Sequence, residues 1–172
     1  MASYTNDWVI LDPKMRVQAI NAVTTVPNHP LGTRVRAKDN GTGAFGEGEF
    51  IYVKGVASGA IGAWVTYNAD DWTTALLAAN ASAPVGIMIA AIDAATKYGW
   101  VQIWGKAVGL ALTGYADNGL VYATATAGSV DDAVVAGDRV KLAKGASALD
   151  TPDTGFAEFE IHYPYMDDGA AT

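Results

Sequence analysis

The amino-acid sequence predicts an all-β protein built as a single β-sandwich or barrel, with a jelly roll as one variant. Glycine occurs 19 times in 172 residues, and alanine, valine and threonine are frequent. Apolar runs are only about four to eight residues long, the length of strands joined by tight turns. A hydrophobic content of 51% is enough for one domain with a real core.

Three segments alternate between apolar and polar residues, which is typical of half-exposed strands. In residues 34–38 the small apolar side chains point one way and three cations point the other. By the same rule Val140 and Leu142 should face the core, with Arg139 and Lys141 outward. A third strand should present Glu158, Glu160 and His162 to solvent and direct three residues inward, namely Phe159, Ile161 and Tyr163.

Two further segments are apolar on both faces and should form covered, central strands: Phe50–Val53 and Val85–Ala91. One short helix is also expected. Asp70 or Asp71 can cap it, Asn80 can end it, and three residues between them have helical spacing, namely Trp72, Leu76 and Ala79.

Three parts follow along the chain. Residues 1–30 should be an extended N-terminal arm, because Pro13, Pro27 and Pro30 interrupt it. Residues 31–166 should form the β body, and residues 167–172 a polar tail.

The first residues lack the pattern of a signal peptide, and no run approaches the roughly 20 apolar residues of a membrane span. We therefore expect synthesis in the cytoplasm and no membrane partner.

Charge is unevenly distributed along the chain. The net charge is −7, but residues 1–38 carry +3 and residues 39–172 carry −10. The acidic body disfavours nucleic-acid binding. A basic segment on an acidic body can pair with carboxylates of a protein partner, although a solvated strand face explains part of the same pattern. The candidate docking residues are Lys14, Arg16, Arg34, Arg36 and Lys38.

Residues that usually carry chemistry are scarce. There is no cysteine, and the two histidines, His29 and His162, stand near no recognisable nucleophile. Aspartate pairs lack the spacing of a calcium loop. We therefore expect no metal, no cofactor and no enzymatic activity. A hydrolase remains an alternative only if carboxylates converge in space, the candidates being Glu47, Glu49, Glu158 and Glu160.

One glycine pattern resembles a nucleotide-binding motif in its spacing. Gly41, Gly43 and Gly46 spell G-x-G-x-x-G, but a dinucleotide site requires a buried strand before the motif and a helix after it. The preceding segment is cationic, and the following one is another strand. A hairpin loop is the better interpretation.

The most informative aromatic pattern lies in residues 100–104. Alternation would place Trp100, Gln102 and Trp104 on one face of a strand, opposite Val101 and Ile103. Two tryptophans on one face indicate either a sandwich core or a subunit interface, and both interpretations stay open. A carbohydrate-binding sandwich would instead use a platform of Trp8, Trp64 and Trp72.

Four stretches, in order, resemble those of decoration or cement proteins from the heads of tailed bacteriophages. They are GEGEFIYVKG (46–55), YGWVQIWGKA (98–107), ATAGSVDDAVVAGDRV (125–140) and FEIHYPY (159–165). Together they sample residues 31–165 and leave the arm outside the resemblance. None of them is a catalytic signature.

The resemblance implies a structural role without a reaction. It implies an all-β body on the capsid exterior of the virion, as homo-oligomers and often trimers, that bridges and stabilises the major capsid protein. Two alternatives remain: a head-fibre or tail adaptor of a phage particle, and the carbohydrate-binding module.

Overall fold

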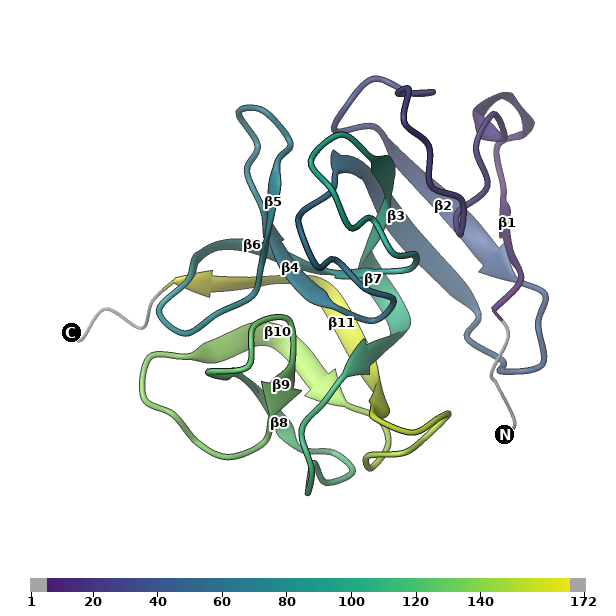
Figure 1. The fold of residues 1–172 in the computed structure, drawn as a ribbon. Helices are drawn as coiled ribbons and strands as arrows, with labels where there is room; N and C mark the ends of the chain where they lie inside the picture. The colour runs from purple at the N-terminus through teal and green to yellow at the C-terminus, as the bar shows by residue number, and fades with distance from the viewer. Residues whose placement is uncertain (1–5, 168–172) are drawn as a thin grey trace.

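The computed structural model describes residues 6–167 and confirms the all-β class (Figure 1). The strands are β1 (Trp8–Ile10), β2 (Arg34–Asp39), β3 (Glu47–Lys54), β4 (Trp64–Tyr67), β5 (Thr74–Leu76), β6 (Ser82–Met88), β7 (Tyr98–Leu110), β8 (Leu120–Ala123), β9 (Val130–Asp131), β10 (Arg139–Gly145) and β11 (Phe156–Asp167). A single 3₁₀ turn, η1 (Pro13–Met15), is the only helical element in this range. No helix among residues 6–167 is long and apolar enough to cross a membrane.

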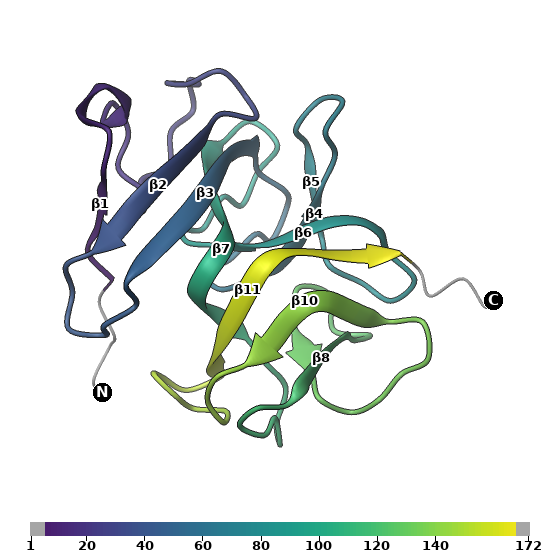
Figure 2. The ribbon, with the colours of Figure 1, turned by 180° about the vertical axis from the view of Figure 1, so that it is seen from behind.

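Hydrogen bonds join the strands of residues 6–167 into one antiparallel sheet. Its main order is β1-β2-β3-β7-β6-β11-β10-β8-β9, and β4 and β5 branch from β6. A jelly roll, one of the variants that the sequence left open, has two sheets, whereas the strands here belong to one hydrogen-bonded sheet. The two longest strands, β7 and β11, run side by side and bend, so that the β1–β3 part and the β8–β10 part lie at different ends of the molecule (Figures 1 and 2).

The bent sheet encloses three apolar clusters in a sandwich-like arrangement. The largest cluster packs Trp64 against Phe159, with ring centroids 4.9 Å apart. A second cluster lies beneath β1, β2 and β3 and contains Trp8, Phe50 and Trp100. The third covers the opposite face of β3 and β7. Because β3 has a cluster on each side, its residues must be apolar on both faces.

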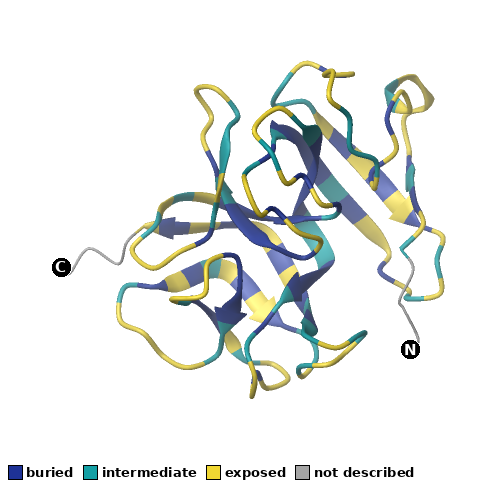
Figure 3. Cartoon of the chain, in the orientation of Figure 1, coloured by how far each residue is buried: buried dark blue, intermediate teal, exposed yellow. Residues whose placement is uncertain are grey.

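Several strands lie where alternation predicted them. Along β2 the exposed cations alternate with buried Val35 and Ala37, visible as bands of colour in Figure 3. Residues 50–53 are fully buried in β3 between β2 and β7. The predicted central segment Val85–Ala91 coincides with β6 up to Met88, and residues 85–88 are buried.

The predicted helix between Asp70 and Asn80 is wrong. Residues 68–73 form a turn. The Asn68 N–H donates to the Thr73 carbonyl and the Trp72 N–H donates to the Asn68 carbonyl, and the chain returns as β5 beside β4. Trp72 has a φ of 58°, which no α-helix accepts, and its indole stacks on Tyr67 and covers Gly32. The packing of this tryptophan therefore outweighs the helical spacing that contains it.

The inward orientation predicted for Leu142 and Tyr163 is also wrong, because both side chains are exposed. Both residues have positive φ, and the β10–β11 register shifts between Lys141 and Ala143. Such β-bulges turn the following side chains to the other face of the sheet. Val140, Phe159 and Ile161 face the core as predicted.

The N-terminal segment packs on the body of its own chain. β1 adds an edge strand to β2, and Thr24 bridges to Tyr98. Ile20 is fully buried, and the Gln18 amide oxygen accepts a 2.6 Å hydrogen bond from the Tyr52 hydroxyl. Residues 6–30 are thus bound along the β2–β3 part, where the sequence predicted an extended arm. Residues 1–5 lie outside the described range, as does the predicted tail beyond Asp167, which is the last residue of β11.

His29 lies near the end of this segment, and its burial predicts that the free energy of unfolding depends on pH. Its ring is buried against Tyr52 and Trp100, at centroid distances of 5.3 and 5.1 Å. Burial lowers the pKa of His29 below its ordinary value of 6.5, so the unfolded chain binds a proton more readily than the folded one. The free energy of unfolding should therefore fall as the pH drops below about 6.5.

The measurement is urea denaturation at pH 7.5 and at pH 5.5. His29→Phe keeps an aromatic ring at this position but cannot titrate. Its free energy of unfolding should therefore fall less between pH 7.5 and pH 5.5 than that of the wild type. An equal decrease in both proteins would show that other groups cause it.

Candidate interaction surface

A row of polar and aromatic side chains crosses four neighbouring strands on the solvent side of the sheet. The cross-strand register aligns Arg36 of β2 with Glu49 of β3, Glu49 with Trp104 of β7, and Trp104 with His162 of β11. Side chains that pair directly across strands contact one another. With Arg34 and Tyr163, which adjoin the row, these six residues form what we call the aromatic–cation surface.

Glu49 is the electrostatic centre of the aromatic–cation surface. Its carboxylate lies 3.8 Å from the Arg34 guanidinium and 3.7 Å from that of Arg36. The Tyr163 hydroxyl donates a 2.8 Å hydrogen bond to the same carboxylate, which raises the pKa of Tyr163. Glu49 is only 12% exposed, whereas the two arginine side chains are 52% and 58% exposed. Two guanidinium groups that share one shielded carboxylate leave an excess of positive charge at the surface.

Aromatic rings hold the two arginines in place. The Arg36 guanidinium carbon lies 5.7 Å from the centre of the Trp104 ring, and that of Arg34 lies 5.9 Å from the Tyr163 ring. Trp104 in turn meets His162 edge to face at 6.1 Å. Cation–π contacts of this kind fix the guanidinium groups without using their hydrogen-bond donors. The surface therefore presents ordered donors to a partner.

The residues predicted on one face of β7 are divided between its two faces. Trp100 and Gln102 are completely buried, Trp100 in the cluster with Tyr52 and Phe50. A bulge shifts the β3–β7 register between Glu49 and Phe50 and turns Trp104 to the opposite, solvent side. The expectation that all three share a face is thus wrong. Trp100 belongs to the core, and Trp104 to the aromatic–cation surface.

Gln102 stabilises the backbone of β7 next to this bulge. Its amide nitrogen donates hydrogen bonds to the backbone oxygens of Trp104 (3.1 Å) and Lys106 (2.9 Å). These bonds satisfy carbonyls where β7 departs from regular pairing. Gln102 therefore supports the orientation of Trp104 from below and is not accessible to a partner.

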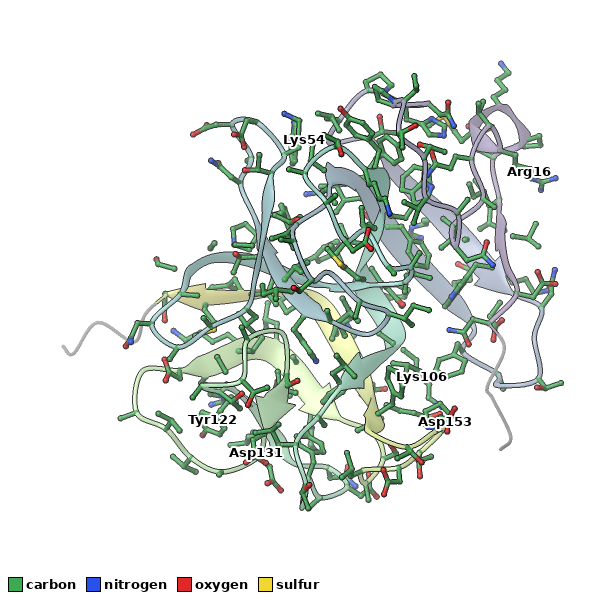
Figure 4. All side chains as sticks on the ribbon, in the orientation of Figure 1. Arg16, Lys54, Lys106, Tyr122, Asp131 and Asp153 are labelled. Carbon is green, nitrogen blue, oxygen red and sulfur yellow. The ribbon has the colours of Figure 1, made fainter. Side chains whose placement is uncertain are left out.

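The other predicted docking cations lie apart from the aromatic–cation surface. Lys14 is exposed in η1, and the Arg16 guanidinium donates a 2.7 Å hydrogen bond to the Ile10 carbonyl at the edge of β1, where Figure 4 labels it. Arg16 thereby covers part of an edge strand, a common protection against unwanted pairing. Lys38 is exposed and pairs in register with Glu47. Of the five candidates, Arg34 and Arg36 are the two that the fold joins to aromatic neighbours.

The G-x-G-x-x-G segment is the hairpin loop that the sequence predicted. It joins β2 to β3, and the Asp39 carboxylate accepts hydrogen bonds from the backbone N–H groups of Asp7 (3.0 Å), Gly41 (2.9 Å) and Phe45 (3.1 Å). Backbone N–H groups of such a loop hold phosphate in nucleotide-binding proteins. Here the Asp39 carboxylate already accepts hydrogen bonds from two of these N–H groups, those of Gly41 and Phe45.

The residues that could carry acid–base or metal chemistry are dispersed. Among residues 6–167, no group of three histidine, aspartate or glutamate residues is placed to hold a metal ion. Glu49 is engaged by the arginines, and Glu158 binds Lys106 at 2.8 Å. His29 is enclosed by aromatic rings, and His162 is exposed beside Trp104.

The tryptophans proposed for a sugar platform do not form one. Trp8 and Trp64 are buried in different clusters, and Trp72 covers Gly32. A groove near Tyr67 and Ser82 is lined by hydroxyl and small apolar side chains. Two of its threonines are already engaged, since Thr73 donates to Asp71 and Thr74 donates to the Lys54 carbonyl.

Sequence reasoning missed Glu49, His162 and Tyr163 as members of the surface. Glu49 was considered only as a catalytic carboxylate, His162 as a solvent-facing residue, and Tyr163 as a core residue. The available signal was the pairing of charge between residues 34–36 and residue 49, which lie on neighbouring strands of one hairpin. The register that brings β11 beside β7 has no comparable local signal.

No family model matches this chain, and searches of curated proteins and of solved structures likewise found no match.

Proposed function

We propose that this protein is a structural component of a tailed-phage particle that binds the exterior of the capsid and bridges major capsid protein subunits. The proposal rests on the resemblance of four segments to decoration proteins, with one structural observation that supports a docking role. That observation is the aromatic–cation surface, where the exposed Arg34 and Arg36 lie beside the half-buried Trp104. Tryptophan and arginine are enriched at the energetic centres of protein interfaces.

The distribution of charge supports the same role. The chain has a net charge of −7, so an exposed pair of arginines is a local exception. A cationic patch on an acidic protein orients it toward an acidic partner and directs the remaining negative charge outward. In this proposal the protein acts on the virion as a homo-oligomer, with the trimer favoured, and performs no reaction.

Copy number tests the proposal against the alternative of a head-fibre or tail adaptor. Quantitative mass spectrometry of purified virions should give hundreds of copies, in a fixed ratio to the major capsid protein. A dozen copies or fewer would assign the protein to a vertex or to the tail instead.

Charge reversal at the surface should weaken attachment. Arg34→Glu combined with Arg36→Glu should lower the affinity for phage particles that lack the protein by at least about tenfold, because two ordered cations are replaced by repelling anions. Co-sedimentation with such particles, over a range of protein concentrations, measures the affinity.

The matched control reverses two cations outside the aromatic–cation surface, Lys97→Glu with Arg139→Glu. Lys97 forms an exposed ion pair with Asp93, whose loss costs little stability. The control carries the same change in net charge and should bind like the wild type. An equal loss in both double variants would mean that net charge, and not this surface, controls attachment.

A further inference from the structure

A line of register shifts crosses the sheet beside the aromatic–cation surface. On β7 the shift follows Gln102, and on β10 and β11 it lies between the pairs Lys141–Tyr165 and Ala143–Ile161. At the second shift, each of the two facing strands contains one residue with left-handed backbone: Leu142, with φ 59°, and Tyr163, with φ 54°.

These paired bulges change which residues face the core. Along β11 the buried positions are 157, 159 and 161 before the bulge, and 164 and 166 after it. Along β10 they are 140 before the bulge, and 143 and 145 after it. The residues at the change of face point outward, so Leu142 is 56% exposed and Tyr163 is 43% exposed.

Leucine and tyrosine are unfavourable residues for this backbone conformation. Glycine and asparagine adopt positive φ at a much lower cost, because Cβ and the side chain of other residues crowd the following carbonyl. Large apolar side chains at exposed left-handed positions therefore oppose both the local conformation and the tendency to bury apolar area. Strain of this kind concentrates where proteins bind or react.

The surroundings of the two bulges have the composition of an interface. Tyr163 is bound to Glu49 and lies under the Arg34 guanidinium. Tyr165, also exposed, faces the Lys141 ammonium at 5.7 Å, and that ammonium forms an ion pair with Asp167. An exposed tyrosine beside the Arg34 and Arg36 guanidinium groups, with an exposed leucine on the next strand, forms a patch that is apolar on one side and cationic on the other. Tyrosine and arginine are enriched in binding hot spots.

We propose that Leu142 and Tyr163 are the apolar anchors by which this protein grips an acidic protein surface. This inference rests on the proposed function and specifies its docking site. Leu142 inserts into a hollow of the partner, and partner carboxylates pair with Arg34 and Arg36. Within residues 6–167 these two arginines share one counterion, Glu49, at 3.7–3.8 Å. The partner is a protein and not a nucleic acid, because the exposed Leu142 and Tyr163 side chains gain by contact with apolar surface, which a phosphate backbone does not offer.

One substitution separates binding from stability. Leu142→Asn removes the apolar knob but suits positive φ, so the midpoint of urea unfolding should be equal to or above that of the wild type. Affinity for phage particles that lack the protein, measured by co-sedimentation, should fall at least tenfold. The matched control is Ser58→Asn, because Ser58 is an exposed residue with φ 65° that lies in the loop after β3. It should bind like the wild type.

Wild-type affinity in Leu142→Asn would overturn the inference. A binding loss accompanied by a clearly lower unfolding midpoint would also overturn it, because the side chain would then act through the fold. Tyr163→Asn is a second test of binding alone. It should lower the affinity at least tenfold, while its unfolding midpoint also reflects the loss of the hydrogen bond to Glu49.

A cross-linking experiment distinguishes this inference from the proposed function. A photoreactive phenylalanine derivative replaces Leu142 in infected cells, and the same derivative at position 58 is the control. One outcome is a cross-link to an acidic segment of a protein other than the major capsid protein. If Leu142→Asn weakens the binding of that protein to the purified chain and Ser58→Asn does not, the result would contradict the proposed function and support the inference. A cross-link to a second copy of this chain, to nucleic acid, or to nothing would overturn it.

Discussion

Replacing Trp100 with alanine is expected to lower the free energy of unfolding by about 3–5 kcal/mol, the usual cost of removing a large aromatic side chain from a core. Trp100 is completely buried and packs against Tyr52 at 4.9 Å and His29 at 5.1 Å. These two neighbours belong to β3 and to the N-terminal segment, so the cavity would loosen both. A loss of this size is a large part of the stability of an ordinary domain.

Urea denaturation followed by far-ultraviolet circular dichroism measures this loss. Trp104→Ala is the matched control, because it removes the same side chain four residues further along β7. There the side chain is only half-buried and contacts Arg36 and His162 among the described aromatic and cation–π pairs. Its cost should stay near 1 kcal/mol. Similar losses in the two variants would contradict the assignment of Trp100 to the core and Trp104 to the surface.

Replacing Asp39 with alanine is expected to lower the free energy of unfolding by about 2–4 kcal/mol, the range for losing hydrogen bonds to a buried charged acceptor. The carboxylate is 8% exposed and accepts three backbone hydrogen bonds, from Asp7, Gly41 and Phe45. Bonds to a charged acceptor are worth more than neutral ones, and their loss leaves N–H groups without a partner. The change should loosen both the β2–β3 loop and the approach to β1.

Asp12→Ala provides the comparison for Asp39→Ala. Asp12 also accepts a backbone hydrogen bond, from Lys14, but at an exposed turn where water can replace it. Its replacement should cost less than about 1 kcal/mol. Hydrogen exchange of the Gly41 and Phe45 amides should rise in the Asp39 variant alone. Unchanged exchange there would show that the loop holds its shape without the carboxylate.

Local patterns were sufficient for the strands whose two faces differ chemically. β2 alternates between cations and small apolar residues, and β3 is apolar on both faces because a cluster lies on each side of it. The G-x-G-x-x-G segment could likewise be assigned to a hairpin, because the segments before and after it are strands. In each case the deciding contacts lie within one hairpin.

The failures lie where distant parts of the chain compete with the local pattern. Trp72 has helical spacing with Leu76, yet it stacks on Tyr67 and forces a turn. Leu142 and Tyr163 fit an alternating strand, yet paired bulges reverse their orientation. A bulge changes the face of every following residue, so one unrecognised bulge invalidates the prediction for the rest of the strand.

The sequence by itself determined the all-β class, the position of the cationic strand β2, and the unequal charge of the two parts of the chain, because these depend on composition and on neighbours a few residues apart. The tertiary structure alone decided which aromatic residues accompany the cations. Arg36, Glu49, Trp104 and His162 come from four strands and align only because β3, β7 and β11 pair in one register. That register follows from the packing of the whole sheet, since the bulges that bend it also turn Trp104, Leu142 and Tyr163 toward solvent.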